Sequence, residues 1–379
     1  MLEERGIKIN VEPEEEPTKE SEVFYNDDMI LNRDISVSAL KTYRKDQNID
    51  LKVLDALSGS GIRGLRYLKD VPGLEKVTMN DTKPEAEENI RENLGINDLP
   101  DEKTEVTGKD ANVLMTERRK GYHYIDLDPF GSPARFLDST ARSLKHDSFV
   151  GITATDLATL CGTYVKTCRR RYSTWVKNMP YHHEVGLRVL IMKVFNSFAV
   201  HDKVFDPKLC YAKKHYYRIF GEVRETKKGV NRSLDKIGFI TACRSCGYRN
   251  MVEEREHVGE RCPKCGENAE RLGPLWIGKT GRKGFIKNVR KDLEEKGIEN
   301  AVELVSKLEK ESEIKKPFYD THNIGNITGM PAVRRKNILG KLEEKGYNAV
   351  ETHFSPTGIK TNAPIEDIVS ISKELNRHK

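Results

Sequence analysis

The chain has 379 residues, of which 37% are hydrophobic and 33% are charged, and its formal net charge is +6. This length allows two or three domains with a sizeable buried core. No apolar run approaches the roughly 20 residues that span a bilayer, and the acidic N-terminus has no apolar signal region. We therefore expect neither a membrane-spanning nor a secreted protein but a cytoplasmic one that makes no contact with a membrane.

The predicted elements begin with an acidic, proline-containing arm at residues 11–22, which we expect to be poorly ordered. Short apolar runs then alternate with segments of helical apolar spacing. Strands are predicted at residues 51–57, 74–81, 104–111, 122–130 and 147–156, with helices at 62–70 and 83–95. Strands separated by helices in this order predict a Rossmann-like, doubly wound parallel sheet in an α/β protein.

A cysteine-rich segment at about residues 238–272 interrupts this alternation and is predicted to form an inserted, zinc-ribbon-like unit. From about residue 281 the chain becomes helical and charged, and two later stretches flank an extended segment at residues 353–364. We therefore predict a first domain over residues 1–280 with the ribbon inserted in it. Residues 281–379 are predicted to form a smaller α+β accessory domain that binds RNA.

A glycine-rich loop follows the first predicted strand. Gly59, Gly61 and Gly64 form a G-x-G-x-x-G pattern that opens a helix. Glycines permit a tight turn and a close approach of the backbone to a ligand. By itself the loop fits a nicotinamide or flavin dinucleotide nearly as well as S-adenosylmethionine.

Carboxylates at three successive strand ends favour S-adenosylmethionine. Asp55 lies four residues before Gly59, Asp81 ends the second strand, and Asp110 follows the third with Ala111 beside it. A carboxylate at the second position can accept both ribose hydroxyl protons, and one at the third can accept from the adenine amino group. The alternative for Asp81 and Asp110 is helix capping or turn formation.

The fourth predicted strand ends in Asp128-Pro129-Phe130-Gly131, which is similar to the (D/N)-P-P-(Y/F) motif of amino-group methyltransferases. The exocyclic amine of a base is a poor nucleophile, so a carboxylate and the Pro129 carbonyl are needed to hold its protons and aim its nitrogen. Phe130 is placed to stack on a base extruded from the RNA. An ordinary strand-to-turn Asp-Pro is the alternative. Asp126, on the same strand face as Asp128, is the back-up candidate for the carboxylate and is expected to be a hydrogen-bonded support.

The segments DALSGSGIRGLRYLKD, NDTKPEAEENIRENL and DLDPFGSP, with FYNDDMILNRDIS upstream, resemble the tRNA guanine-26 N2-dimethyltransferase family of archaea and eukaryotes. These are class I S-adenosylmethionine-dependent methyltransferases. The resemblance implies methyl transfer from S-adenosylmethionine to the guanine N2 amine at tRNA position 26, giving N2-methyl- and N2,N2-dimethylguanosine. It covers nearly the whole chain.

The same resemblance implies roles for residues outside the motifs. Arg33 is expected to contact the methionine end of the cofactor, and Arg66, rather than Arg63, to add a second contact. Phe24 and Tyr25 are expected near the target base. The sequence departs from the family at residues 26–28, where Asn-Asp-Asp stands in place of the expected Asn-Pro.

Four of the seven cysteines have metal-ligand spacing. Cys243 and Cys246 form one C-x2-C pair, and Cys262 and Cys265 form a second pair after fifteen intervening residues. Each turn directs two thiolates toward one tetrahedral ion, and four thiolates leave no open position for a substrate. We therefore predict a closed structural zinc site, in which iron could substitute.

Two other groups of reactive residues have less specific surroundings. Cys161 could be the nucleophile of a cytosine C5 methyltransferase, but a buried apolar thiol is the preferred interpretation for Cys161 and Cys168. His182-His183-Glu184 lacks the second histidine of the zinc-protease motif. This trio is expected to be structural or to face RNA.

Positive charge is concentrated in one part of the chain. Residues 163–232 contain sixteen Lys and Arg against five Asp and Glu, whereas residues 1–30 contain three basic and ten acidic side chains. Basic residues alternate with aromatic ones at 168–177 and 212–220, and a further basic joint spans 278–291. This pattern indicates a tRNA partner and no obligate protein partner. An adenine N6 amino-methyltransferase and a non-catalytic RNA-binding module remain alternatives.

Overall fold

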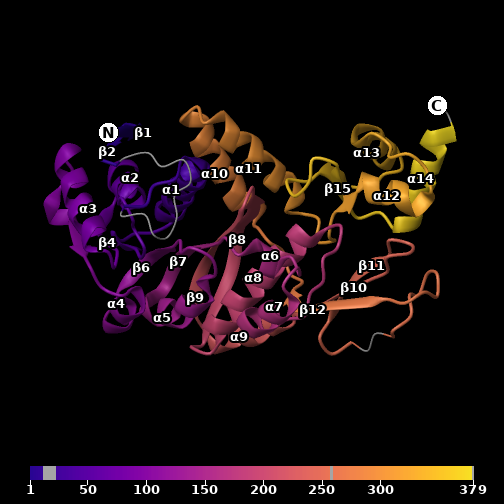
Figure 1. Cartoon of the computed structure of the whole chain (residues 1–379), viewed down its shortest axis with the longest axis horizontal. Coiled ribbons are helices and arrows are strands. Elements are labelled where there is room, and N and C mark those ends of the chain that lie inside the picture. The colour runs from indigo at the N-terminus through magenta and orange to yellow at the C-terminus, as the bar shows by residue number, and fades with distance from the viewer. Residues whose placement is uncertain (12–22, 257–258, 378–379) are drawn as a thin grey trace.

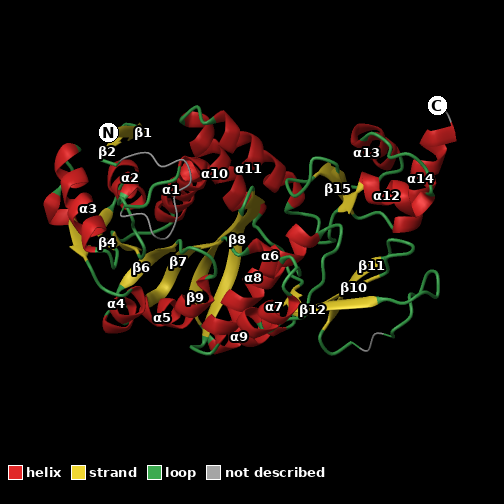
Figure 2. Cartoon of the chain, viewed as in Figure 1, coloured by secondary structure: helices red, strands yellow, loops and turns green. Residues whose placement is uncertain are grey.

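The computed structural model describes residues 1–11, 23–256 and 259–377, and a seven-stranded sheet lies at its centre (Figures 1 and 2). The strands of this sheet are β3 (Leu51–Asp55), β4 (Leu74–Asn80), β5 (Thr104–Thr107), β6 (Tyr122–Leu127), β7 (Leu144–Ala154), β8 (Lys203–Lys213) and β9 (Tyr216–Glu225). Their order is β5-β4-β3-β6-β7-β9-β8. β5, β4, β3, β6 and β7 are parallel, and β9 is antiparallel to both β7 and β8. The predicted doubly wound sheet is confirmed, with all five predicted strands present.

Helices cover both faces of the sheet (Figure 2). One face carries α1 (Ile30–Lys45), α2 (Ile62–Asp70), α3 (Pro84–Ile96), α10 (Lys283–Glu295) and α11 (Glu299–Glu311). The other face carries α4 (Ala111–Glu117), α5 (Leu137–Ser143) and α8 (His182–Ala199). The side chains of successive residues in a strand point to opposite faces of the sheet, so Val53 packs in one hydrophobic cluster and Leu54 in the other. Burial on both faces explains why the parallel strands are continuous apolar runs.

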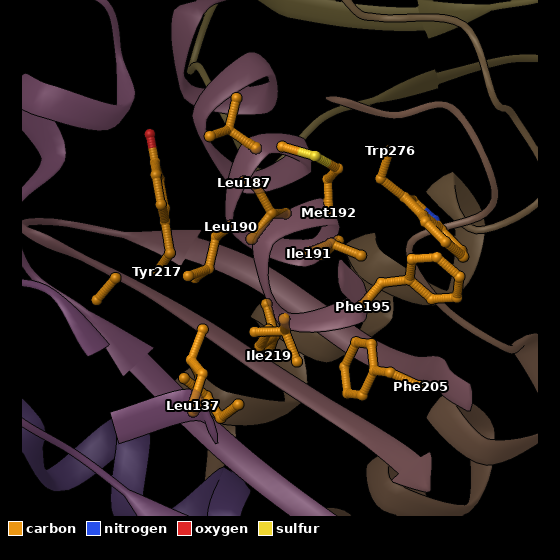
Figure 3. Packing of buried hydrophobic residues seen from close by; sticks show 14 of the residues in the cluster. Leu137, Leu187, Leu190, Ile191, Met192, Phe195, Phe205, Tyr217, Ile219 and Trp276 are labelled. Atoms are coloured by element: carbon orange, nitrogen blue, oxygen red, sulfur yellow. The ribbon is translucent and has the colours of Figure 1, made fainter. Parts of the chain in front are cut away.

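The apolar cluster on the α8 face is shown in Figure 3. Leu190 and Ile191 of α8 lie near Ile219 of β9, and the rings of Phe195 and Trp276 are 5.6 Å apart. Trp276 belongs to the inserted ribbon. The insert is therefore anchored to the core of the sheet domain by an apolar contact.

The sheet reverses its order at β3. β4 and β5 are added on one side of β3, and β6 and β7 on the other. In sheets of this kind, ligands bind outside the carboxyl ends of the strands where the order reverses. The loops that follow β3, β4, β5 and β6 therefore mark the expected site.

The predicted ribbon and the smaller α+β unit are both present. The ribbon strands β10 (Ile237–Ala242), β11 (Arg249–Glu253) and β12 (Glu270–Trp276) form an antiparallel sheet in the order β11-β10-β12. The C-terminal unit contains β13 (Tyr319–Asp320), β14 (Ala349–Glu351), β15 (Gly358–Thr361), α12 (Thr321–Thr328), α13 (Arg335–Glu344) and α14 (Ile365–Arg377). Its separate hydrophobic cluster starts at Tyr319, whereas α10 and α11 pack in the cluster of the first domain.

The remaining described elements are short. They are the N-terminal hairpin β1 (Leu2–Glu4) and β2 (Ile7–Ile9), the helices α6 (Leu157–Leu160), α7 (Val165–Tyr172) and α9 (Lys227–Leu234), and the 3-10 turns at 27–29, 101–103 and 133–136. The arm predicted at residues 11–22 lies, apart from its first residue, outside the described residues. Among the helices that the structure describes, none is long and apolar enough to cross a membrane.

Candidate active site

The glycine loop after β3 is held against the segment that precedes α1. Gly59 has a φ of +53°, and a Cβ built on it would lie 2.8 Å from the Phe24 carbonyl oxygen. The Ser60 N–H donates to that same oxygen at 3.1 Å. Any side chain at position 59 would therefore separate the two segments, and Gly61 likewise has a positive φ of +78°.

The strand-end carboxylates differ in their contacts. Asp81 accepts from the Gly59 N–H at 2.9 Å and from the Lys83 N–H at 3.1 Å, so it is joined directly to the glycine loop. Asp110 is exposed and accepts from two N–H groups in the first turn of α4 at 2.9 and 3.2 Å. Ala111 beside it is buried. The capping role that the sequence left open for Asp110 is thus present in the structure.

Asp55 lies beneath the loop. It is buried and accepts from the Gly64 N–H at 3.1 Å, which fixes the first turn of α2. Burial, together with the negative charge of nearby Asp126, raises the pKa of Asp55 to about 7. In this structure Asp55 therefore supports the loop from inside the fold.

Asn80 is a further residue of this edge that belongs to none of the predicted motifs. It is fully buried at the end of β4, and its side-chain amide donates to the Ala56 carbonyl at 3.0 Å and to the Lys109 carbonyl at 2.9 Å. It also accepts from the Lys109 N–H at 3.1 Å. Asn80 thus ties together the ends of β3, β4 and β5, and the signal was an amide directly before the strand-end Asp81.

Arg33 and Arg66 converge on one acid of the N-terminal hairpin. Arg33 donates to Glu4 at 2.5 and 2.9 Å, and Arg66 contacts Glu4 at 2.9 Å and Asp34 at 2.8 Å. All four side chains are buried. Burial alone would raise the pKa of Glu4, but the two guanidinium groups hold it below its usual value. Arg33 also donates to the Asn26 carbonyl at 3.0 Å, which places it beside the loop before α1.

Arg63 reaches the predicted catalytic loop. It forms an ion pair with Asp128, and its Nε lies 3.5 Å from Asp126. Its Nη1 donates to the Asn32 side chain at 3.0 Å. The structure therefore brings Arg63, the less favoured of the two arginines in the resemblance, to the predicted catalytic motif, whereas Arg66 faces the N-terminal hairpin.

The three predicted catalytic residues occupy the loop after β6. Asp128 is partly exposed and Pro129 is buried. Phe130 is 49% exposed, and its ring meets the ring of Phe24 edge to face with centroids 4.5 Å apart. An acceptor carboxylate and an exposed aromatic ring therefore lie two residues apart in the loop at the carboxyl edge of the sheet.

Asp126 is the electrostatic centre beneath this loop. It is fully buried, pairs with Arg218 at 2.5 Å and accepts from the hydroxyls of Tyr67 at 2.5 Å and Tyr124 at 2.7 Å. Burial alone would raise the pKa of Asp126, but Arg218 and Arg63 lower it to about 2. Asp126 therefore stays ionised and supports the site from below.

A glycine in β7 makes this pairing possible. β7 lies between β6, which carries Asp126, and β9, which carries Arg218. A Cβ built on Gly151 would lie 2.5 Å from the Arg218 guanidinium and 2.6 Å from the Tyr124 hydroxyl. The missing side chain lets Arg218 cross β7 to reach its partner.

The family model for N2,N2-dimethylguanosine tRNA methyltransferases matches residues 6–373. The chain belongs to this family. The tRNA (guanine(26)-N(2))-dimethyltransferase of Methanobrevibacter smithii is 37% identical over 99% of this chain and 97% of its own. An Aquifex aeolicus relative, named as a guanine-26 and guanine-27 N2-dimethyltransferase, is 35% identical over 98% and 95%.

A solved structure of a family member agrees with this assignment. The complex of Trm1 from Pyrococcus horikoshii with S-adenosyl-L-methionine superposes with a TM-score of 0.84 at 35% identity, covering 94% of this chain and 96% of that one. The family resemblance inferred from the sequence motifs is therefore confirmed, and so is the methyltransferase fold.

The four cysteines predicted to bind a metal come together in the ribbon of this chain. All four Sγ atoms lie within 4.8 Å of one another, with Cys243 3.5 Å from Cys265 and Cys246 3.6 Å from Cys262. Four thiolates that each lie about 2.3 Å from a zinc ion occupy the corners of a tetrahedron, and their sulfur atoms are then slightly farther apart than these two Sγ–Sγ distances. The cluster is thus compatible with a closed structural zinc site that would hold the two turns of the ribbon together.

The other reactive residues are built into the interior. Cys161 is buried 3.0 Å from the Tyr217 hydroxyl, and burial raises the pKa of its thiol to about 11. Such a thiol stays protonated, unlike an activated nucleophile. Glu184 is fully buried and pairs with Arg188 at 2.8 Å and with Lys360 at 2.9 Å, linking α8 to the C-terminal unit. In the structure Glu184 is a packing and pairing residue.

Proposed function

We propose that this chain transfers methyl groups from S-adenosylmethionine to the N2 amine of the guanine at tRNA position 26, giving N2-methyl- and N2,N2-dimethylguanosine. The named activities of its family relatives support the substrate. The observation that carries the proposal is the loop after β6, where Asp128, the Pro129 carbonyl and the exposed Phe130 stand beside the glycine loop.

We assign the cofactor to the carboxyl edge of β3, β4 and β5. Gly59 and Gly61 allow a close backbone approach, and Asp81 is joined to that loop through the Gly59 N–H. Asp110 and the Ala111 backbone would face the adenine. The fit is supported by Gly59, whose missing side chain keeps the loop next to the Phe24 carbonyl.

The methionine end would be held by arginine. Arg33 is assigned to the carboxylate, which would share the guanidinium group that now binds Glu4. Arg66 is assigned to the same end of the cofactor, and Asp55 is assigned to the support of the glycine loop. Arg63 is added because it is the α2 arginine that contacts the catalytic loop.

The residues of the loop after β6 then account for the reaction. When bound, S-adenosylmethionine supplies an electrophilic methyl group. Asp128 and the Pro129 carbonyl accept the two amine protons, which directs the nitrogen lone pair along the line of displacement. As the new N–C bond forms, the bond between the methyl carbon and the donor sulfur would break and leave its electron pair on the sulfur, and Asp128 would take the proton that the nitrogen loses. Phe130 stacks on the extruded base and keeps its edge toward Asp128.

Arg63 has a second consequence for Asp128. Its ion pair orients this carboxylate before RNA arrives. The base must then share the carboxylate with Arg63, whose other partners, Asp126 and Asn32, remain in place. Arg63 therefore positions the acceptor as well as the cofactor end of the site.

The tRNA would lie over the basic segments and the accessory region. The segments at 168–177 and 212–220 supply alternating basic and aromatic side chains for this contact, and residues 281–379 are assigned to tRNA binding. A substrate of this kind places the protein in the cytoplasm.

The test uses purified protein, unmodified tRNA and methyl-labelled S-adenosylmethionine, followed by nucleoside analysis. We expect label in N2-methyl- and N2,N2-dimethylguanosine from tRNA with guanine 26, and none when position 26 is adenine. Label in N6-methyladenosine would support the adenine alternative instead. Label that is retained in a tRNA with guanine at position 27 but not at position 26 would extend the specificity to position 27.

The catalytic assignment is tested by Asp128→Ala. We expect turnover to fall at least about 100-fold, while S-adenosylmethionine and tRNA still bind, since Arg63 keeps Asp126 and Asn32 as partners. Asp138→Ala, which changes an exposed carboxylate on α5, is the matched control. Equal turnover in the two variants would remove Asp128 from the mechanism.

A further inference from the structure

Three large aromatic side chains of the described residues are exposed: Phe130 at 49%, Tyr164 at 60% and Trp175 at 52%. Phe130 already has a role beside the catalytic carboxylate. Tyr164 directly precedes α7 and Trp175 follows it by three residues. We propose that Tyr164, Trp175 and the exposed cations of α7 bind unpaired RNA nucleotides that flank the target guanine, an inference that rests on the proposed function.

Helix α7 is fastened to the catalytic loop. The Ser132 and Tyr172 hydroxyls are 2.7 Å apart, and Tyr172 donates to Asp156 at 2.7 Å. Asp156 also pairs with Arg171 at 3.1 Å. Ser132 lies two residues after Phe130, so these contacts fix the position of α7 relative to the base-stacking ring.

The backbone that carries Trp175, after the end of α7, is also held in place. The backbone N–H of Trp175 donates to the Gly273 carbonyl at 3.0 Å, and the backbone N–H of Gly273 donates to the Trp175 carbonyl at 2.8 Å. Gly273 lies in β12, and α7 lies next to that strand in Figure 1. The indole is thus carried by an immobilised backbone although its ring is exposed, as a stacking platform requires.

The cations of α7 are not neutralised by the protein. Lys166, Arg169 and Arg170 are exposed, and within the described residues none of them has a carboxylate partner. Arg169 and Arg170 are favoured by the C-terminal end of the helix dipole, but Lys166 lies in the first turn, where the dipole is unfavourable to it. Lys166 and Arg170 are also four residues apart, where like charges repel. A bound polyanion would relieve both effects.

RNA is the partner that matches this combination. Phosphates bind the cations, while bases stack on exposed aromatic rings regardless of sequence. A guanine that leaves the stack also leaves its neighbours without one face of their stacking. Tyr164 and Trp175 would replace those lost contacts beside the extruded base.

Helix α9 supplies a matched control. Like α7 it has eight residues, and Lys228 and Arg232 are exposed four residues apart with no carboxylate partner in the described chain. Because β9 runs antiparallel to β7, α9 lies at the opposite edge of the sheet from the catalytic loop. The pairs Lys166→Ala/Arg170→Ala and Lys228→Ala/Arg232→Ala therefore remove the same charge from the two edges.

The affinity of full-length protein for unmodified tRNA would be measured between 50 and 200 mM salt. The logarithm of the binding constant falls as the logarithm of the salt concentration rises, and each lost contact to single-stranded phosphate reduces the magnitude of this slope by about 0.7. The α7 pair should therefore reduce that magnitude by about 1.4. The α9 pair should leave the slope unchanged. Equal slopes in the two variants, whether both reduced or both unchanged, would overturn the proposal.

Trp175→Ala and Tyr164→Ala test the stacking. Each should raise KM for tRNA about tenfold with kcat within about twofold, because stacking contributes to RNA binding before chemistry. Leu234→Ala, an exposed apolar change on α9, is the control, and unchanged S-adenosylmethionine affinity checks the fold. A KM within twofold of wild type in both aromatic variants would overturn the proposal. Wild-type protein that binds tRNA without methylating it would instead refute the proposed function, and the binding slopes would still decide this inference.

Discussion

Replacing Asp126 by Asn should destabilise the sheet domain severely, although the two side chains have nearly the same shape. Asp126 is fully buried between Arg218 and Arg63, and the amide would leave both cations with less compensation. The ordinary aspartate pKa of 3.8 is lowered to about 2, which corresponds to about 2.5 kcal/mol at 1.36 kcal/mol per pKa unit. Because the folded-state pKa is depressed, this contribution is present above pH 4 and is lost as the pH falls through 2.

The full cost is expected to exceed that value. Removing one partner of a buried ion pair leaves an uncompensated charge and typically costs about 3–5 kcal/mol. Urea unfolding at pH 7, followed by circular dichroism, would measure the change. Asp235→Asn, in which an exposed carboxylate loses its 2.9 Å pair with Arg255, should change stability by at most about 1 kcal/mol.

A double-mutant cycle separates the ion pair from general disturbance. Arg218→Met removes the cation while keeping an unbranched side chain, and the double variant removes both charges together. The double variant should lose less stability than the sum of the two single variants, with a coupling of at least about 1 kcal/mol. Additive losses, or an Asp126→Asn protein within about 1 kcal/mol of wild type, would refute the reasoning.

Three further outcomes are expected. Cys243→Ser should reduce the zinc content of the purified protein and lower the thermal stability of the ribbon before it affects methyl transfer; full zinc content measured by mass spectrometry would contradict the four-cysteine site. The pKa of Asp55 is about 7 in the folded chain, above its unfolded value, so stability should fall as the pH rises from about 4 to 7 and then level off. Asp55→Asn should flatten this slope in urea unfolding between pH 5 and 8, and an unchanged slope would exclude Asp55 as its source. Glu184→Gln should leave Arg188 and Lys360 buried without their carboxylate and loosen the C-terminal unit, seen as faster limited proteolysis after residue 311; wild-type cleavage rates would contradict this role.

The sequence by itself determined the features that depend on local chemistry. The five parallel strands were predicted from apolar runs that end in turns, because strands buried on both faces must be apolar throughout. The glycine loop, the Asp128 loop and the two C-x2-C turns were placed from the sequence because each is a continuous motif with its own backbone requirement. The β8–β9 hairpin was not predicted, because its basic segment at 212–220 was interpreted as an RNA-facing patch.

Only the tertiary structure decided which residues meet. Arg63 and Arg66 are three positions apart on α2 and share a helix face, so helical spacing cannot separate them. Arg63 contacts Asp128, which lies 65 residues later in the sequence, whereas Arg66 contacts Glu4 of the N-terminal hairpin, which lies 62 residues earlier. Arg218 reaches Asp126 only because Gly151 lies between their strands. These contacts depend on strand order and on the space that neighbouring side chains leave free, and neither is encoded in a local pattern.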